Sequence, residues 1–195
     1  MIREEVTSCK KCGLHATRTN AVPGAGACDA DVMFVGEAPG RGEDARGEPF
    51  VGAAGTKLAG ALHRAGFSRD MVYITNVVKC RPPGNRTPTA PERQACSGHL
   101  RAEIEAVRPR IICILGNTAF GSILGGREIT RNRGKTVSMD GQLYYITIHP
   151  AAIIYNQELA GTFDGDIKRL AEITKRLKDG GEVAPDVEYP SRTAR

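Results

Sequence analysis

The sequence predicts an α/β protein, a three-layer αβα sandwich built around a central four-stranded parallel sheet. Four short apolar runs, bounded by glycine, proline or polar residues, are typical of strands that are covered on both faces. Segments with helical spacing separate these runs, and strands that alternate with helices favour a parallel sheet with right-handed crossovers. The expected strands are residues 31–35, 72–75, 111–115 and 144–148.

Length and composition fit a single globular domain. The chain has 195 residues, of which 41% are hydrophobic and 25% are charged, and this composition is that of a folded protein rather than a disordered one. We expect one domain over residues 1–178. In residues 179–195, glycine, proline and charge replace apolar periodicity, so we expect a flexible C-terminal tail there.

Charge, apolar runs and cysteine content narrow the class of protein. Lys and Arg outnumber Asp and Glu by 27 to 22, giving a net charge of +5, which suits a polyanionic partner as well as a mildly basic enzyme. No apolar run reaches the length of a membrane span, and the N-terminus lacks the apolar region of a signal peptide. We therefore expect a cytoplasmic protein without membrane contact. In that compartment six cysteines favour metal binding or burial over disulfides.

The segment over residues 36–55 follows the first strand and is expected to be a long irregular loop, because it holds six glycines and two prolines in twenty positions. Farther along, Thr89 and Glu92 have the spacing of a capping box at a helix start. Residues 125–142 read as a basic connection. The expected helices cover about residues 53–65, 90–106, 118–124 and 163–178.

Polar and aromatic side chains follow the carboxyl ends of the expected strands, the edge where such sheets bind ligands. Glu37, Glu43 and Phe50 lie in the loop after the first strand, Asn76 ends the second, and His149 follows the fourth. An asparagine amide matches the edge of a nucleobase, and a histidine can stabilise negative charge or transfer a proton. Each residue alone also fits a cap, a turn or a core contact; their shared placement favours a ligand site.

The cysteines offer a candidate metal site. Cys9 and Cys12 form a C-x-x-C pair, and Cys80 and Cys96 flank a loop and part of a helix. Four thiolates could hold zinc or a [4Fe-4S] cluster, and the spacing does not choose between them. For Cys80 or Cys96 separately, burial as a small hydrophobic residue is an alternative. Of the two other cysteines, Cys113 is assigned to the core, and Cys28 is assigned no role.

Taken together, GEAPGRGEDARGEPFVGAAG, ITNVVKCRPPGNRTP, the four cysteines and HPAA resemble the family 4 uracil-DNA glycosylases, the iron-sulfur type of bacteria and archaea, over roughly residues 9–160. The resemblance implies a monofunctional enzyme of base excision repair that releases uracil from single- and double-stranded DNA and leaves an abasic site. It also implies a structural [4Fe-4S] cluster held by Cys9, Cys12, Cys80 and Cys96.

By the same resemblance, Phe50 stacks on the flipped uracil, Asn76 bonds its edge and His149 faces its O2 atom. Breaking the bond from C1′ to N1 leaves a uracil anion, so a donor near O2 lowers the barrier, and the base must leave the duplex to be reached. Gly36 and Ala38 line the substrate site. In family 1 an aspartate that activates water stands at the position of Ala38; the base here is open between Glu37, Glu43 and none.

Five basic residues are candidate phosphate contacts, and Ile153 takes the place of the leucine wedge of family 1. We expect a monomer, with other repair proteins as further partners. One alternative is a non-catalytic nucleic-acid-binding module with zinc in the four cysteines. Another is the branch of the superfamily that links covalently to DNA through a histidine. Residues 81–92 contain no histidine, which argues against this branch. The phosphate candidates are Arg81, Arg86, Arg131, Arg133 and Lys135.

Overall fold

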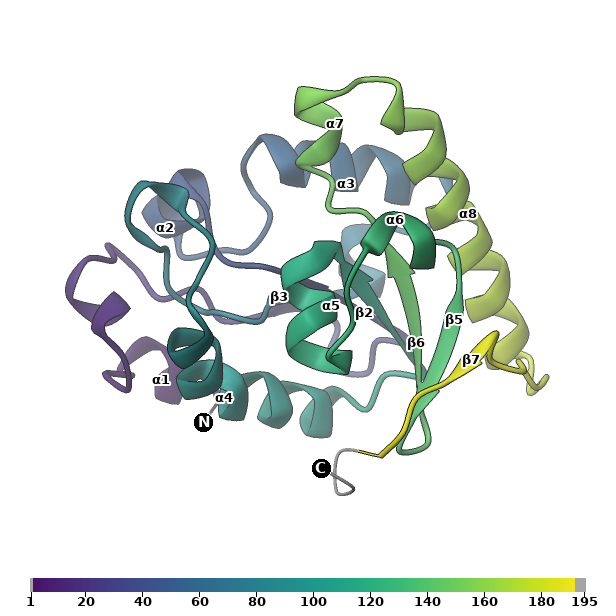
Figure 1. Ribbon diagram of the computed structural model, residues 1–195, viewed down its shortest axis with the longest axis horizontal. Helices are drawn as coiled ribbons and strands as arrows, with labels where there is room; N and C mark the ends of the chain where they lie inside the picture. The colour runs from purple at the N-terminus through teal and green to yellow at the C-terminus, as the bar shows by residue number, and fades with distance from the viewer. Residues whose placement is uncertain (1, 192–195) are drawn as a thin grey trace.

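A computed structural model describes residues 2–191 and gives a mixed α/β fold (Figure 1). Within these residues one sheet of seven strands has the order β1-β3-β2-β4-β6-β5-β7. The α/β class predicted from the sequence is thereby confirmed. The strands are β1 (Ala25–Gly26), β2 (Val32–Gly36), β3 (Tyr73–Asn76), β4 (Ile111–Leu115), β5 (Thr136–Met139), β6 (Gln142–Thr147) and β7 (Val187–Glu188).

The four expected strands correspond to β3, β2, β4 and β6, which pair in parallel with one another. The sheet as a whole is mixed and larger than the four-stranded parallel sheet we expected. β1 adds to β3 in antiparallel orientation, and β5 adds to β6 in the same way. The β5–β6 hairpin turns at Asp140 and Gly141, whose φ angles of 51° and 78° are those of the two-residue Asp-Gly turn that favours a hairpin.

Helices cover both faces of the sheet. Figure 1 shows α5 in front of the sheet and α3 behind it, and α3 packs against α8. The helices are α1 (Ile2–Thr7), α2 (Arg41–Arg46), α3 (Ala53–Arg64), α4 (Ala90–Val107), α5 (Gly116–Leu124), α6 (Ile129–Asn132), α7 (Ala152–Tyr155) and α8 (Leu159–Lys178), with 3-10 turns at Gly13–Ala16, Arg69–Met71 and Pro83–Asn85.

Sequence prediction was accurate for the long helices and wrong for the short elements. Thr89 and Glu92 form the expected capping box of α4, with the Thr89 side chain accepting from the Glu92 N–H. Residues 36–55 are not entirely irregular, because α2 forms between Gly40 at its N-terminus and Gly47 at its C-terminus. Gly47 has a φ of 72°, the left-handed conformation that glycine adopts freely at a helix end.

The remaining differences lie in connections. The basic segment 125–142 contains α6 and β5, and α8 begins at Leu159, four residues before the expected start at 163. In the tail, β7 pairs with β5, so residues 187–188 belong to the sheet. Flexibility elsewhere in residues 179–195 stays a prediction, and its part over 192–195 lies outside the described residues. No helix within residues 2–191 has the length and apolar character to cross a membrane.

The sheet places the chemistry at one edge. β2 and β4 are buried along their whole length, as expected of strands covered on both faces. In the parallel register Gly36 stands opposite Asn76, and Leu115 stands opposite Thr147. The segments that follow these strands therefore emerge side by side, and they build the cavity described next.

Candidate active site

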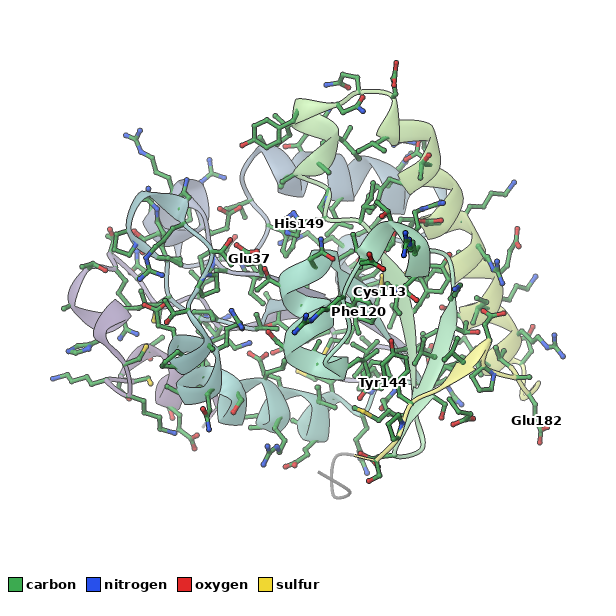
Figure 2. The ribbon with its side chains drawn as sticks, in the orientation of Figure 1. Glu37, Cys113, Phe120, Tyr144, His149 and Glu182 are labelled. Atoms are coloured by element: carbon green, nitrogen blue, oxygen red, sulfur yellow. The ribbon has the colours of Figure 1, made fainter. Side chains whose placement is uncertain are left out.

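A cavity of about 340 Å³ opens at the carboxyl ends of the strands. Figure 2 shows Glu37 and His149 at this end of the sheet. The cavity brings together all the residues that the sequence singled out for catalysis, and three of the four singled out for substrate binding. It also contains residues of the Pro82–Arg86 loop and of α7. The predicted residues that line it are Glu37, Ala38, Glu43, Phe50, Asn76 and His149.

Gly36 lies behind the cavity and allows Phe50 and Asn76 to meet. A Cβ atom at this position would lie 2.5 Å from Asn76 Oδ1 and 2.5 Å from the Phe50 ring. Both contacts are too short for any side chain, so the sequence requires glycine here. The ring of Phe50 and the amide of Asn76 thus form two adjoining walls, on which a flat ligand could stack and hydrogen-bond at the same time.

The Phe50 backbone is held in an uncommon conformation. Its φ is 54°, in the left-handed region that bulky residues rarely adopt. Arg69 donates hydrogen bonds to the carbonyl oxygens of Pro49 and Phe50. A Cβ atom at Gly55 would lie 1.8 Å from the Phe50 oxygen, so α3 packs directly beneath this turn. These contacts fix the ring in place, and strain of this kind is found at ligand sites.

Asn76 presents an unpaired acceptor to the cavity. The residue is 2% exposed, and its Oδ1 atom has no hydrogen-bond partner among the residues described. Leaving a buried polar atom unpaired costs about 1–3 kcal/mol, and buried amides in proteins are otherwise satisfied. A ligand with an N–H group on its edge would supply the missing partner.

His149 is held as a neutral imidazole. The Ala151 N–H donates to His149 Nδ1 over 3.2 Å, so the ring proton lies on Nε2. Burial lowers the pKa of His149 to about 4, although the charge of Glu43 acts in the opposite direction. The ring centroid lies 5.7 Å from that of Phe50, with an angle of 32° between the planes. At neutral pH the side chain therefore offers an N–H donor without a charge.

The two acids of the site differ in their surroundings. Glu43 is 8% exposed, and its oxygens accept from the backbone N–H groups of Gly40 at 3.1 Å and Gly52 at 2.7 Å. It therefore ties together two turns of the loop. Glu37 is partly exposed, and its Oε2 atom accepts from the hydroxyl of Thr118 in the first turn of α5. Thr118 was not predicted, although it follows the third strand as Asn76 follows the second.

All four predicted cysteine ligands line a second, small cavity. Among the described residues no three His, Cys, Asp or Glu side chains are grouped as ligands of a metal ion. Nitrogen donors face the sulfurs: Arg18 donates to Cys80 Sγ over 3.0 Å, and the Lys79 N–H donates to Cys96 Sγ over 3.3 Å. In the same cavity the buried His99 Nε2 has no partner within the described chain.

The donor set fits an iron-sulfur group. Four soft thiols, surrounded by N–H groups, are the ligands and the outer contacts of such clusters. Burial raises the pKa of Cys96 to about 11 and also raises the pKa of Cys80. A bound metal group would supply the positive charge that stabilises the thiolates. Neither Arg18 nor His99 was predicted: Arg18 is sixty-two residues from Cys80, and His99 lies on a helix face that the sequence alone does not orient.

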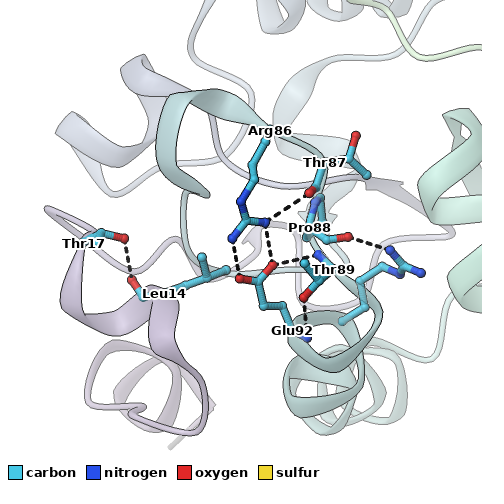
Figure 3. A network of polar contacts seen from close by, with 8 residues as sticks. Leu14, Thr17, Arg86, Thr87, Pro88, Thr89 and Glu92 are labelled. Atoms are coloured by element: carbon cyan, nitrogen blue, oxygen red, sulfur yellow. Dashed lines mark hydrogen bonds and ion pairs between the residues drawn. The ribbon is translucent and has the colours of Figure 1, made fainter.

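Two of the predicted phosphate contacts lie at or beside the cavity. Arg86 lines it and forms a two-pronged ion pair with Glu92, with N–O distances of 2.9 Å and 2.7 Å (Figure 3). Arg86 thereby holds the pKa of Glu92 well below its ordinary range. Arg81 donates to Asn85 Oδ1 over 2.7 Å, and Asn85 also lines the cavity.

Of the other three basic candidates, one lies in α6 and two lie between α6 and β5, and none of them lines the cavity. Arg131 is exposed and pairs with Glu128 at 3.0 Å. Arg133 donates to both oxygens of Asp166, at 3.0 Å and 2.5 Å, and Asp166 is only 4% exposed. Lys135 is partly exposed. The guanidinium of Arg133 is thus engaged by the protein interior.

Ile153 does not have the exposure expected of a wedge, and its role stays a prediction. The residue is 3% exposed and belongs to the core. The chain after Pro150 forms the single turn α7, which directs Ile153 inward and leaves Ile154 41% exposed and Tyr155 90% exposed. Tyr155 lines the cavity. No capping signal marks this short helix, which has no side-chain cap.

Comparison with known proteins gives a consistent result. The family model described as the uracil DNA glycosylase superfamily matches residues 23–179. A type-4 uracil-DNA glycosylase of Archaeoglobus fulgidus is 45% identical, over 88% of this chain and 91% of the relative. Relatives of the same name from Sulfurisphaera tokodaii and Thermotoga maritima are 46% and 42% identical, over 88% and 90% of this chain and 83% and 94% of theirs. The chain therefore belongs to the uracil-DNA glycosylase superfamily.

Proposed function

We propose that the protein hydrolyses the N-glycosidic bond of deoxyuridine in DNA, releasing uracil and leaving an abasic site for base excision repair. The observation that carries this proposal is the unpaired, buried Oδ1 atom of Asn76 beside the ring of Phe50. An aromatic face and an amide edge are what a flipped pyrimidine needs for recognition. The type-4 glycosylase names of the relatives support the same activity.

Base recognition would begin with stacking on Phe50. Because Gly36 has no side chain, the base can lie against the ring and reach the Asn76 amide. The amide of asparagine pairs with the N3–H and O4 edge of uracil, whereas cytosine presents a different pattern, and a mismatched buried polar edge is strongly rejected. Gly36 and Ala38 contribute backbone to this part of the site.

His149 would stabilise the departing uracil. Negative charge develops on uracil O2 as the bond from C1′ to N1 breaks, and a donor aimed at that oxygen lowers the barrier. Burial lowers the pKa of His149, so the imidazole is neutral at pH 7. Its Nε2–H group donates a hydrogen bond to the oxygen. The proton stays on Nε2 and stabilises the anion through a hydrogen bond.

Of the two acids, we assign Glu37 to the hydrolytic water. Both oxygens of Glu43 are engaged by backbone N–H groups, which gives this side chain the task of shaping the loop. The Thr118 hydroxyl orients Glu37 at the cavity wall. A carboxylate in this position can hold water against the positive charge that develops on the sugar. Ala38 contributes no side-chain base.

The DNA would approach across the loop 82–86 and α7. Arg81 and Arg86 are the proposed phosphate contacts nearest the cavity, with Arg131 and Lys135 farther along the strand. Tyr155 replaces Ile153 as the group that fills the space of the flipped base, because it is exposed at the cavity. Both single- and double-stranded DNA fit this arrangement. Action as a monomer, contacts with other repair proteins and a cytoplasmic location remain part of the proposal.

We further propose that Cys9, Cys12, Cys80 and Cys96 hold a [4Fe-4S] cluster with a structural role. The cluster would join three parts of the chain from which these ligands come: the N-terminal segment, the segment that follows β3, and α4. Bound metal that is absent from the unfolded chain contributes its binding free energy to folding. Zinc in the same cysteines is the alternative that a metal analysis must exclude.

Replacing Asn76 by alanine should lower kcat/KM for uracil release from a dU-containing oligonucleotide by about 10- to 100-fold, because the base loses hydrogen bonds in a buried site. Gel analysis of the abasic product measures this loss. Asn132→Ala, on α6 away from the cavity, should behave as wild type. Equal activity of wild type and Asn76→Ala would disprove the role of Asn76, and absence of uracil release by the wild type would disprove the activity.

The pH profile of uracil release should remain flat from neutral pH down to about pH 4. The lowered pKa keeps His149 neutral above that value. Activity falls as the pH drops through it, because a proton on Nδ1 removes the hydrogen bond from the Ala151 N–H that holds the ring in place. This fall in activity at low pH should persist in Glu37→Gln and disappear in His149→Asn. A limb at the ordinary histidine pKa of about 6.5 would contradict the assignment.

Tyr155→Ala should raise KM for duplex DNA by about tenfold, with a smaller effect on single strands, since only the duplex loses a stacking partner when its base flips. Thermal unfolding should be unchanged, because the side chain is 90% exposed. Ile153→Ala, in contrast, should destabilise the fold by about 2–5 kcal/mol. Equal losses on both substrates for Tyr155→Ala would argue against a wedge.

Anaerobically purified protein should be brown and contain about four iron atoms per chain. Cys96→Ser should lose the iron and the colour, whereas Cys28→Ser should retain both, because Cys28 is exposed and does not line the cysteine cavity. Elemental analysis with visible absorption provides the measurement. A colourless protein with stoichiometric zinc would refute the cluster.

A further inference from the structure

A fully buried ion pair lies directly beneath the base-recognition residue. Lys79 Nζ contacts Glu103 Oε2 at 2.6 Å, and the two side chains are 1% and 0% exposed. Neither residue lines the candidate active site, and the roles proposed above use neither side chain, although the Lys79 backbone N–H contacts Cys96 Sγ. The pair connects the end of β3 to the middle of α4.

Every donor of the ammonium group is used. Besides Glu103, Lys79 Nζ donates to Thr75 Oγ1 at 2.5 Å and to the backbone oxygen of Asn76 at 2.7 Å. Glu103 in turn accepts from the Thr75 hydroxyl at 2.7 Å and from the Gly24 N–H at 2.8 Å. Lys79, Glu103 and Thr75 thus form a closed and rigid network, since each of the three is hydrogen-bonded to the two others.

Stability alone gives a weak reason for such a pair. Taking two charges out of water costs several kcal/mol for each ion, and apolar residues of similar volume often stabilise a fold equally well. What an ion pair provides in addition is direction, because its hydrogen bonds define where each atom must lie. The atom that Lys79 directs here is the carbonyl oxygen of Asn76.

The position of Asn76 depends on its backbone more than is usual for a buried amide. Its Oδ1 atom has no partner among the described residues, so no protein hydrogen bond to that atom orients the side chain. The neighbouring backbone is held instead: Val77 N–H donates to Gly36 O at 2.9 Å, and Val78 N–H donates to Glu37 O at 3.1 Å. The Lys79 ammonium completes this set of restraints from below.

We propose that Lys79, held by Glu103, is a positioning residue that sets the orientation of the Asn76 amide and so determines how accurately uracil is bound. The inference rests on the proposed role of Asn76 in recognition. Lys79 touches neither substrate nor solvent and acts only through the Asn76 backbone. A misplacement of a recognition group by about 1 Å can cost on the order of 100-fold in rate.

The test is a double-mutant cycle between the ion pair and Asn76. Lys79→Met alone leaves a buried carboxylate unpaired and can unfold the protein, so the pair is replaced together, as Lys79→Met with Glu103→Gln. This variant should fold, retain the iron content of the wild type, and release uracil with kcat/KM reduced by about 10- to 100-fold. Free uracil should inhibit it more weakly than it inhibits the wild type.

In the Asn76→Ala background the same pair replacement should cause little further loss, because the residue through which it acts is gone. The matched control is Arg64→Met with Asp164→Asn, which removes an exposed ion pair between α3 and α8 and should leave activity and uracil inhibition unchanged. Melting temperature and iron content are measured for every variant, so that a loss of folded protein is not read as a loss of recognition.

The outcomes separate this inference from the proposed function. Additive losses in the cycle, or unchanged uracil inhibition in the pair variant, would overturn the positioning role and leave recognition by Asn76 intact. If Asn76→Ala itself behaves as wild type, recognition by Asn76 is wrong and the positioning role falls with it. A large loss in the pair variant that vanishes in the Asn76→Ala background supports both.

Discussion

The close approach of Gly36, Phe50 and Asn76 is the constraint on which the site depends. It follows from one pairing register, in which Gly36 of β2 stands opposite Asn76 of β3. A slip of one residue would turn Asn76 to the other face of the sheet. A side chain at position 36 would displace both the ring and the amide. Two motifs forty residues apart thus form one surface because of a backbone pairing and a missing Cβ atom.

Around this contact the buried polar groups fall into two kinds. Glu43 and Glu103 have their oxygens engaged by backbone N–H or side-chain donors, and such satisfied groups hold loops in place. Asn76 Oδ1, in contrast, is buried without a partner among the described residues. His149 is likewise kept neutral by burial. The satisfied groups hold the shape of the loops, and the unpaired Oδ1 atom of Asn76 is left for a ligand.

Local patterns could be predicted from the sequence, whereas long-range partners could not. The four central strands and the capping box of Thr89 depend on neighbouring residues, and the sequence identified them correctly. The cavity residues were found because strand ends share an edge. The Asp166 partner of Arg133 lies thirty-three residues away, and no periodic signal marks it. The inward direction of Ile153 depends on α7, a single turn that packing rather than sequence stabilises.

The cysteine cavity and the base cavity are linked by a segment of five residues. This segment begins at Asn76, whose amide faces the base cavity, and ends at Cys80, a proposed cluster ligand. Between them, the N–H groups of Val77 and Val78 donate to the carbonyl oxygens of residues 36 and 37, and the Lys79 N–H donates to Cys96 Sγ. Anchoring Cys80 therefore restrains the segment at its far end, while Lys79 restrains it from within. The residues after Cys80 form the loop that carries Arg86 to the cavity, so one anchor would serve both the proposed base recognition and the proposed DNA contact. In the proposed function, a metal group at this point would stabilise the site without taking part in the reaction.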